Sequence, residues 1–143
     1  MIGITSFGAY VPRLRLQRGA IVQAMGWFAP ALALAAEGER SMGNWDEDSV
    51  TMAVAAAQNC LAGKSRHEVD ALLLASTTLP FADRQNAGIV AEALNLREEI
   101  FTTDITGSQK AGTAALLSGL ESCASGLRRS VLVASADRRE TRT

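Results

Sequence analysis

An unbroken run of five apolar residues, Ala71–Ala75, constrains the fold of this chain more than any other feature. The run lies in a predicted strand at residues 69–77. It shows no alternation of apolar and polar side chains, which is typical of a strand covered on both faces in an α/β protein. Further strands are predicted at residues 101–105 and 131–136. Helical segments separate the three strands, so the order indicates a largely parallel sheet sandwiched by helices.

The helices between these strands are predicted from apolar residues at helical spacing. The first is opened by residues 46–49, whose acidic side chains favour the positive N-terminal end of a helix dipole, and it ends at Gly63. Two more helices are predicted at residues 86–96 and 111–125. Each therefore connects one predicted strand to the next.

The segment before the first long helix is less regular. Residues 2–11 contain β-forming side chains and predict a strand that Pro12 ends. A short helix is expected at residues 16–25, stopped by Gly26. Residues 27–44 combine apolar side chains with proline and glycine, so we expect a loop with a helical turn there.

Length and charge exclude several classes of protein. The 143 residues are enough for one domain with a hydrophobic core, and no linker or repeat divides them, so residues 1–143 are treated as a single domain. A formal net charge of −1 gives no electrostatic case for a nucleic-acid partner. The most apolar stretch, residues 24–36, is too short to span a membrane. The N-terminus also lacks the pattern of a signal peptide.

The two cysteines, Cys60 and Cys123, lie in Ala-rich helical patterns. Their spacing suggests neither a metal site nor a disulfide framework. Each is expected to act as a small buried apolar residue, and a reducing, cytoplasmic location fits best.

The end of the chain departs from the α/β pattern. The strand at residues 131–136 is followed only by the polar tail 137–143, so no predicted element covers the sheet after its last strand. We interpret this as a chain that has been cut short, or as a half-fold that relies on a partner.

A turn between the strand at 101–105 and the following helix is the strongest candidate for chemistry. Small residues, including Gly107 and Ser108, allow close approach of other backbone, and the helix is expected to begin near Gln109. Free N–H groups at a helix N-terminus stabilise an anion and lower the pKa of a thiol. On the residues alone, a close-packed turn is the simpler interpretation. Asp104, at the end of the strand, is expected to bond nearby backbone N–H groups.

The segment 109–116, Gln-Lys-Ala-Gly-Thr-Ala-Ala-Leu, resembles the cysteine motif of the archaeal and bacterial hydroxymethylglutaryl-CoA synthases. In that motif Ala-Cys precedes Lys-Ala-Gly-Thr-Ala. Segments 8–13, 46–54 and 89–94 match the same family in order. The whole chain thus resembles the N-terminal half of this branch of the thiolase superfamily, and more distantly ketoacyl synthase III.

The resemblance implies a thiolase-like fold, of which this chain would be one half of a two-fold pseudo-symmetric whole. It implies acyl-CoA as partner, with a coenzyme A thioester as substrate and no other cofactor or metal. A cysteine would take the acyl group, and a general base would generate the second carbanion. Such proteins are dimers, so a homo- or hetero-oligomer is expected, with the strand at 131–136 or the one before it as the edge that pairs with the partner.

The chain departs from the family at the catalytic positions. Gln109 holds the position of the cysteine, and an amide cannot carry an acyl group as a thioester. Thr77 holds the position of the general base, and a threonine hydroxyl is a poor base without an activating partner. Lys110 and Ser108 are candidates for substrate binding, although Lys110 suits solvent equally well. The sole histidine, His67, lies in a polar connection and is expected to be exposed.

Three hypotheses follow for an acyltransferase-like chain without a catalytic set. It is the N-terminal half of a condensing enzyme and inactive alone, either as a fragment or as a non-catalytic partner subunit. Alternatively, it is a thioester decarboxylase that uses Gln109 and is completed by a missing second half. A third explanation is that the glutamine or the truncation was introduced in the laboratory. Whether the chain is an enzyme is left open by the sequence.

Overall fold

The computed structural model describes residues 1–139 of the chain. The predicted tail 137–143 therefore lies partly outside the described residues. The chain forms two compact units, one made of Met1–Tyr10 with Asp48–Thr143, and the other of Val11–Glu47. The expectation of a single domain over residues 1–143 stays a prediction.

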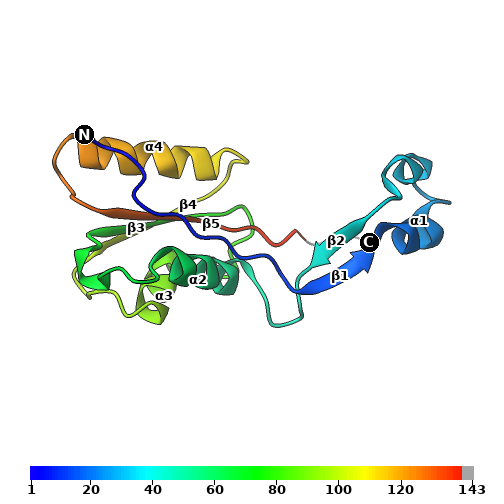
Figure 1. Ribbon diagram of the computed structural model, residues 1–143, viewed down its shortest axis with the longest axis horizontal. Coiled ribbons are helices and arrows are strands. Elements are labelled where there is room, and N and C mark those ends of the chain that lie inside the picture. The colour runs from blue at the N-terminus through cyan, green and yellow to red at the C-terminus, as the bar shows by residue number, and fades with distance from the viewer. Residues whose placement is uncertain (140–143) are drawn as a thin grey trace. The chain divides into compact units, whose positions relative to one another are not determined.

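A three-stranded parallel sheet forms the centre of the larger unit, in the order β4-β3-β5 (Figure 1). The strands are β3 (Ala71–Ala75), β4 (Phe101–Ile105) and β5 (Val131–Ser135). All five residues of β3 are buried, as the unbroken apolar run predicts. Leu73 pairs with Thr103 on one side and with Val133 on the other. The predicted parallel sheet is confirmed.

One face of the sheet is covered by α2 (Ser49–Cys60) and α3 (Asn86–Ala93) (Figure 1). A capping box starts α2, in which Asp48 Oδ1 accepts from Thr51 N at 2.7 Å and Asp48 N donates to Thr51 Oγ1 at 2.8 Å. The two helices pack on alternate strand residues in one buried cluster. Its strand members are Leu72, Leu74, Leu132 and Ala134.

The opposite face carries α4 (Ala111–Ala124), which packs on Leu73 and Ala75 through Ala111 and Ala115. Gly119 allows this close packing, because a Cβ there would lie 3.1 Å from Val133 Cγ2. Helices therefore cover both faces of the sheet, as predicted. A short 3-10 helix, η2 (Arg66–Glu68), precedes β3.

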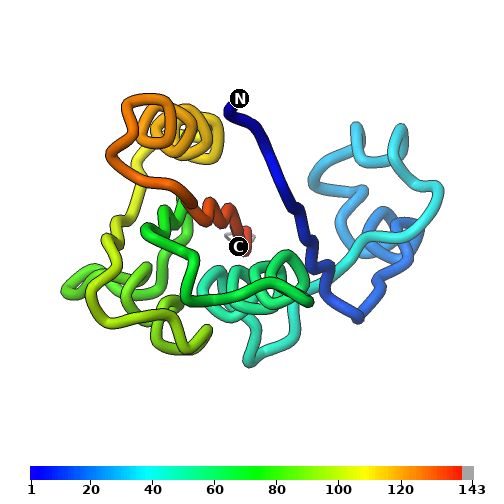
Figure 2. Tube along the Cα trace, turned by 60° about the vertical axis from the view of Figure 1, so that its left-hand side comes forward, coloured from blue at the N-terminus to red at the C-terminus, as the bar shows by residue number. Residues whose placement is uncertain are grey.

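The strand predicted at residues 2–11 is wrong. This segment runs as an extended trace without strand pairing to the described residues (Figure 2). It packs instead on the end of α2, where Ser6 Oγ donates to Cys60 O at 2.7 Å. The β-forming side chains favour an extended backbone, but a strand also needs a paired neighbour. Cys60 is half-buried against the main core rather than fully buried.

The smaller unit contains an antiparallel pair, β1 (Leu14–Gln17) with β2 (Glu39–Met42). The connection holds α1 (Arg18–Met25) and the 3-10 helix η1 (Pro30–Ala35). The predicted short helix and helical turn are confirmed, but neither strand of this pair was expected. Among residues 1–139, no helix is long and apolar enough to cross a membrane.

Candidate functional site

Three loops leave the sheet at the same edge, because β3, β4 and β5 are parallel and their carboxyl ends lie side by side. Backbone hydrogen bonds extend the ladder by one residue into these loops. Ser76 N donates to Ile105 O at 3.1 Å, and Ala136 N donates to Ala75 O at 3.1 Å. In open α/β sheets, ligands bind in the crevice outside this edge. The candidate residues Thr77 and Gln109 lie on two of the three loops.

A carboxylate from the third loop organises the loop after β3. Asp137 Oδ1 accepts from Thr77 N at 2.7 Å, from Thr77 Oγ1 at 3.0 Å and from Ser76 Oγ at 3.0 Å. Thr78 Oγ1 lies 3.4 Å from the same oxygen and accepts from Arg138 N at 2.9 Å. A single carboxylate oxygen thus gathers three consecutive hydroxyl-bearing residues.

Asp137 is ionised at neutral pH. Partial burial works against ionisation, but hydrogen bonds from Thr77, then from Ser76 and Thr78, outweigh it and hold the pKa of the Asp137 carboxyl below its usual range. The position where the sequence resemblance places a general base therefore carries a threonine in direct contact with a carboxylate. No sequence motif marks Asp137, although its place just after β5 puts it at the same edge as Thr77.

Gln109, Ser108 and Lys110 form one exposed turn after β4. Lys110 N donates to Ser108 Oγ at 3.1 Å, and Ala111 N donates to Ser108 O at 3.0 Å. The turn uses Gly107 in a left-handed conformation, with φ of 80°. The helix starts at Ala111, as the predicted range 111–125 has it and two residues after Gln109, and Lys110 gives it no side-chain cap.

The structure therefore divides the four predicted site residues into two groups. Thr77 belongs to the Asp137 cluster, and the other three belong to the turn before α4. Among the described residues no hydrogen bond joins Thr77 to that turn. The turn leaves the Gln109 side chain exposed to solvent, with its carboxamide available to a ligand.

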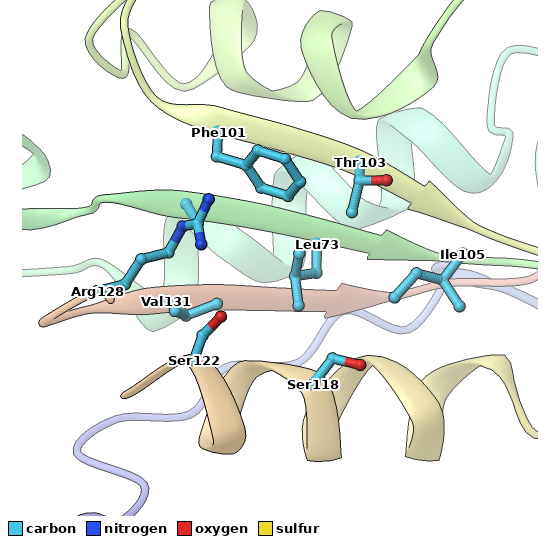
Figure 3. Close-up of a pocket in the computed structure, with 9 residues that line it drawn as sticks. Leu73, Phe101, Thr103, Ile105, Ser118, Ser122, Arg128 and Val131 are labelled. Atoms are coloured by element: carbon cyan, nitrogen blue, oxygen red, sulfur yellow. The ribbon is translucent and has the colours of Figure 1, made fainter. Parts of the chain in front are cut away.

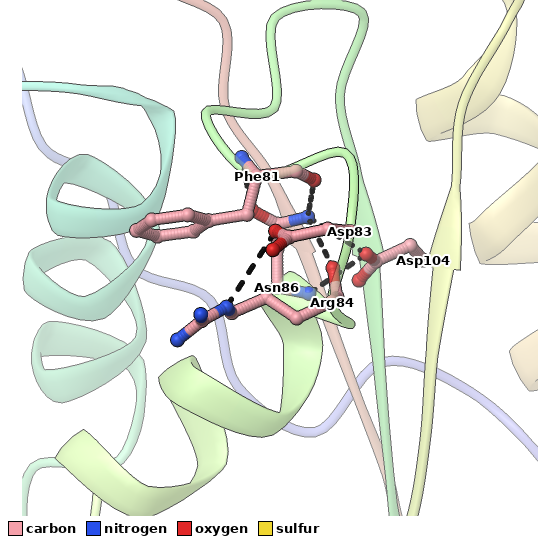
Figure 4. Close-up of polar contacts among 5 residues, drawn as sticks. All are labelled: Phe81, Asp83, Arg84, Asn86 and Asp104. Atoms are coloured by element: carbon pink, nitrogen blue, oxygen red, sulfur yellow. Dashed lines mark hydrogen bonds and ion pairs between the residues drawn. The ribbon is translucent and has the colours of Figure 1, made fainter.

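Asp104 has the structural role that the sequence indicated, although it caps the preceding helix α3 rather than the following turn (Figure 4). Its Oδ1 accepts from Ala87 N at 2.7 Å, and its Oδ2 accepts from Asn86 N at 2.8 Å and from Asn86 Nδ2 at 3.0 Å. The buried Asn86 amide also donates to Phe81 O at 2.9 Å. The connection between β3 and α3 is thus held by Asp137 at its start and by Asp104 at its end.

The remaining candidates lie away from this edge. His67 is exposed on η2, as expected. Cys123 is half-buried near the end of α4, with its sulfur 4.0 Å from Arg129 O. Among residues 1–139, no three histidine, cysteine or acidic side chains are grouped so as to hold a metal ion.

Comparison with known proteins shows which proteins this chain is related to. No family model matches the chain. The hydroxymethylglutaryl-CoA synthase of Archaeoglobus fulgidus is 37% identical over 120 residues, which is 81% of this chain and 35% of that protein. The synthase of Methanocella arvoryzae is 34% identical over 141 residues, 95% of this chain and 40% of that protein. The chain is related to hydroxymethylglutaryl-CoA synthases. It spans well under half the length of these relatives.

Solved structures give the fold. MvaS in complex with 3-hydroxy-3-methylglutaryl coenzyme A superposes with a TM-score of 0.82 at 23% identity, covering 99% of this chain and 36% of MvaS. The β-ketoacyl synthase III of Thermus thermophilus gives 0.78 at 24% identity, covering 94% of this chain and 43% of that one. The thiolase-like fold predicted from the sequence is confirmed, and the partial coverage fits a half-length chain related to the synthases.

Proposed function

We propose that this chain is the N-terminal part of an acyl-CoA condensing enzyme of the hydroxymethylglutaryl-CoA synthase type, and that it binds acyl-CoA without forming an acyl-enzyme. One observation carries the proposal: Gln109, which the resemblance puts at the position of the family cysteine, lies in an exposed turn at the carboxyl edge of the sheet. A carboxamide can donate to a thioester carbonyl but cannot accept the acyl group.

The other site residues support binding at the same edge. Lys110 is a mobile point charge suited to a coenzyme A phosphate, and Ser108 orders the turn that carries Gln109. Thr77 would contact the thioester through its hydroxyl oxygen, because its hydroxyl proton is already given to Asp137. The Asp137 carboxylate takes the place, next to Thr77, of the acidic group that the resemblance leads one to expect.

A second candidate function is thioester decarboxylation, favoured by the exposed carboxamide of Gln109. Such a group can stabilise the thioester carbonyl as carbanion character develops. This chemistry needs further residues from a second half or from another polypeptide. A purely non-catalytic partner subunit is the limiting case, in which acyl-CoA is bound and never transformed.

We also propose that the chain acts as a homo- or hetero-oligomer. Both β4 and β5 are edge strands of the described sheet. On the α4 side, a shallow hollow of about 260 Å³ exposes part of β4, with Arg128 stacked 4.3 Å from the centre of the Phe101 ring (Figure 3). Phe101 is 47% exposed on this open edge. A cytoplasmic location is proposed because Cys60 and Cys123 are both free thiols.

Intact-mass spectrometry after exposure to acetyl-CoA tests the main proposal. We expect the chain to bind acetyl-CoA saturably in calorimetry and to show no covalent acyl adduct. Gln109→Ala should weaken this binding, whereas Gln58→Ala, on the exposed side of α2, should leave it unchanged. An acyl adduct on the unaltered chain, or the absence of any saturable binding, would remove the proposal.

A further inference from the structure

The smaller unit contains an apolar hollow with two cationic side chains at its border. Its volume is about 290 Å³. The side chains that line it are Arg18, Ile21, Val22, Leu32, Ala35 and Arg40. Helix α1 and the 3-10 helix η1 supply the apolar part, and the first residue of α1 and strand β2 supply the two arginines. All of these residues belong to Val11–Glu47.

The two arginines lie at the same end of the β1–β2 pair. Arg40 pairs directly with Leu16, and Arg18 follows Leu16 by two residues. Arg18 N donates to Gly38 O at 3.0 Å, so the backbone pairing continues past the end of β1. Arg18 is the first residue of α1, and it lines the same hollow as Arg40. An anion in the hollow would therefore meet two positive charges.

Both arginines are exposed to solvent, and the acidic residues Glu37 and Glu39 precede Arg40 in the sequence. Glu39 lies on the opposite face of the strand pair, where its Oε1 accepts from Gln17 Nε2 at 2.5 Å. The ion pairs of residues 1–139 involve neither arginine. A bound anion would interact favourably with both arginines, by a modest amount because the two side chains are exposed.

We propose that this hollow binds a small amphiphile with an anionic head, of the class of a medium-chain carboxylate. The carboxylate of the ligand lies between Arg18 and Arg40, and its alkyl chain lies on Ile21, Val22 and Leu32. The volume of the hollow favours a small ligand, because ligand pockets commonly have volumes of about 300–1,000 Å³ and this hollow is at the small end of that range. The site is independent of the acyl-CoA site proposed above and uses none of its residues.

Binding of decanoate to the 143-residue chain, measured by calorimetry below the micelle concentration, tests the proposal. We expect saturable binding that weakens as salt is added, because the contacts between charges are near the surface. Decanol, which has a similar chain and no charge, should bind about fivefold more weakly. These measurements need no altered protein, so they hold whether or not a variant folds.

Variants locate the site. Arg18→Gln and Arg40→Gln should each weaken decanoate binding about fivefold and leave decanol binding unchanged. Arg13→Gln removes an exposed arginine of the same unit that does not line the hollow, and it should have no effect. Equal binding of decanol and decanoate, equal loss in the Arg13 variant, or no saturable binding would each overturn the proposal.

Discussion

Asp137 accepts hydrogen bonds from both the backbone N–H and the hydroxyl of Thr77, at 2.7 and 3.0 Å. The two residues are 60 positions apart in the chain and meet because β3 and β5 are parallel neighbours. This contact joins two of the three loops at the candidate site. It also fixes the direction of the Thr77 hydroxyl, which gives its proton to the carboxylate and leaves its oxygen to accept.

The Asp137 contact should make stability depend on pH. Because the pKa of the folded carboxyl lies below its usual range, folding favours the carboxylate. The stabilisation is present above about pH 4, the ordinary range of an unfolded aspartate, and is lost as the pH falls through the lower folded pKa. Asp137→Asn should lower the free energy of unfolding by about 1 kcal/mol at neutral pH, a modest value because the residue is exposed.

Urea unfolding of the two proteins at pH 7 and near pH 2 checks this prediction. The difference between unaltered chain and variant should shrink toward zero at the lower pH. A difference of the same size at both values would show that the carboxylate charge is not what stabilises the loop.

The cap that Asp104 gives to α3 should be worth more than an ordinary surface contact. Asp104→Ala removes three hydrogen bonds and leaves the backbone N–H groups of Asn86 and Ala87, at the start of α3, without their acceptor. We expect a loss of about 2 kcal/mol in the free energy of unfolding. Glu98→Ala, an exposed acidic residue, is the matched control and should change it by less than about 0.5 kcal/mol. If Asp104→Ala and Glu98→Ala lose similar free energy in thermal or urea unfolding, Asp104 does not stabilise the start of α3.

At the amino edge of the sheet, Asp70 joins three segments. Its Oδ2 accepts from Arg129 N at 2.8 Å and Ser130 N at 3.3 Å, and its Oδ1 lies 3.2 Å from Arg97 Nη2. The bond from Arg129 does most to hold the pKa of the Asp70 carboxyl below its usual range, against the effect of burial. The stabilisation is therefore present above about pH 4 and lost on acidification.

Asp70→Asn should destabilise the chain by about 1 kcal/mol at neutral pH, since an amide keeps one acceptor but loses the charge. Asp83→Asn is the control, because Asp83 makes only an exposed ion pair with its neighbour Arg84 at 3.6 Å. Urea unfolding at pH 7 should separate the two variants. If both behave alike, the three-segment contact contributes nothing measurable.

The sequence predicted the parts of the fold whose pattern is local. The run Ala71–Ala75 is apolar without interruption because it is buried on both faces, and the helices follow from their spacing. By contrast, β1 and β2 are only four residues each and almost wholly exposed, so no buried apolar run marks them as strands. They are strands only because they pair with each other across the connection that holds α1 and η1.

The candidate site divides in the same way. Gln109 and Thr77 could be selected only through the resemblance to a family, because a small-residue turn and a threonine are common in any α/β chain. The place of Asp137 just after a predicted strand put it at the same edge of the sheet, but its contacts with Thr77 could not be predicted, because the two residues are distant in the sequence and meet only when the strands lie side by side. The structural role predicted for Asp104 is correct, but only the folded structure shows that the helix it caps is α3.

The N-terminal segment, residues 2–11, was predicted to be a strand but packs on α2 without strand pairing to the described residues. Gly8 packs on the end of α2 so closely that a Cβ there would lie 2.5 Å from Ala56 O and nearer still to the Cys60 backbone nitrogen. Both atoms belong to helix backbone and cannot move aside cheaply. Gly8→Ala should therefore displace the N-terminal segment and lower the free energy of unfolding by about 2 kcal/mol.

Gly3→Ala is the matched control, because a Cβ at Gly3 would meet nothing within 4 Å. It should leave stability unchanged or raise it slightly, since alanine restricts the unfolded chain. Hydrogen exchange gives the local readout: amides near the end of α2 should exchange faster in the Gly8 variant and not in the Gly3 variant. Unchanged exchange and stability in the Gly8 variant would mean that the segment does not pack on α2 in solution.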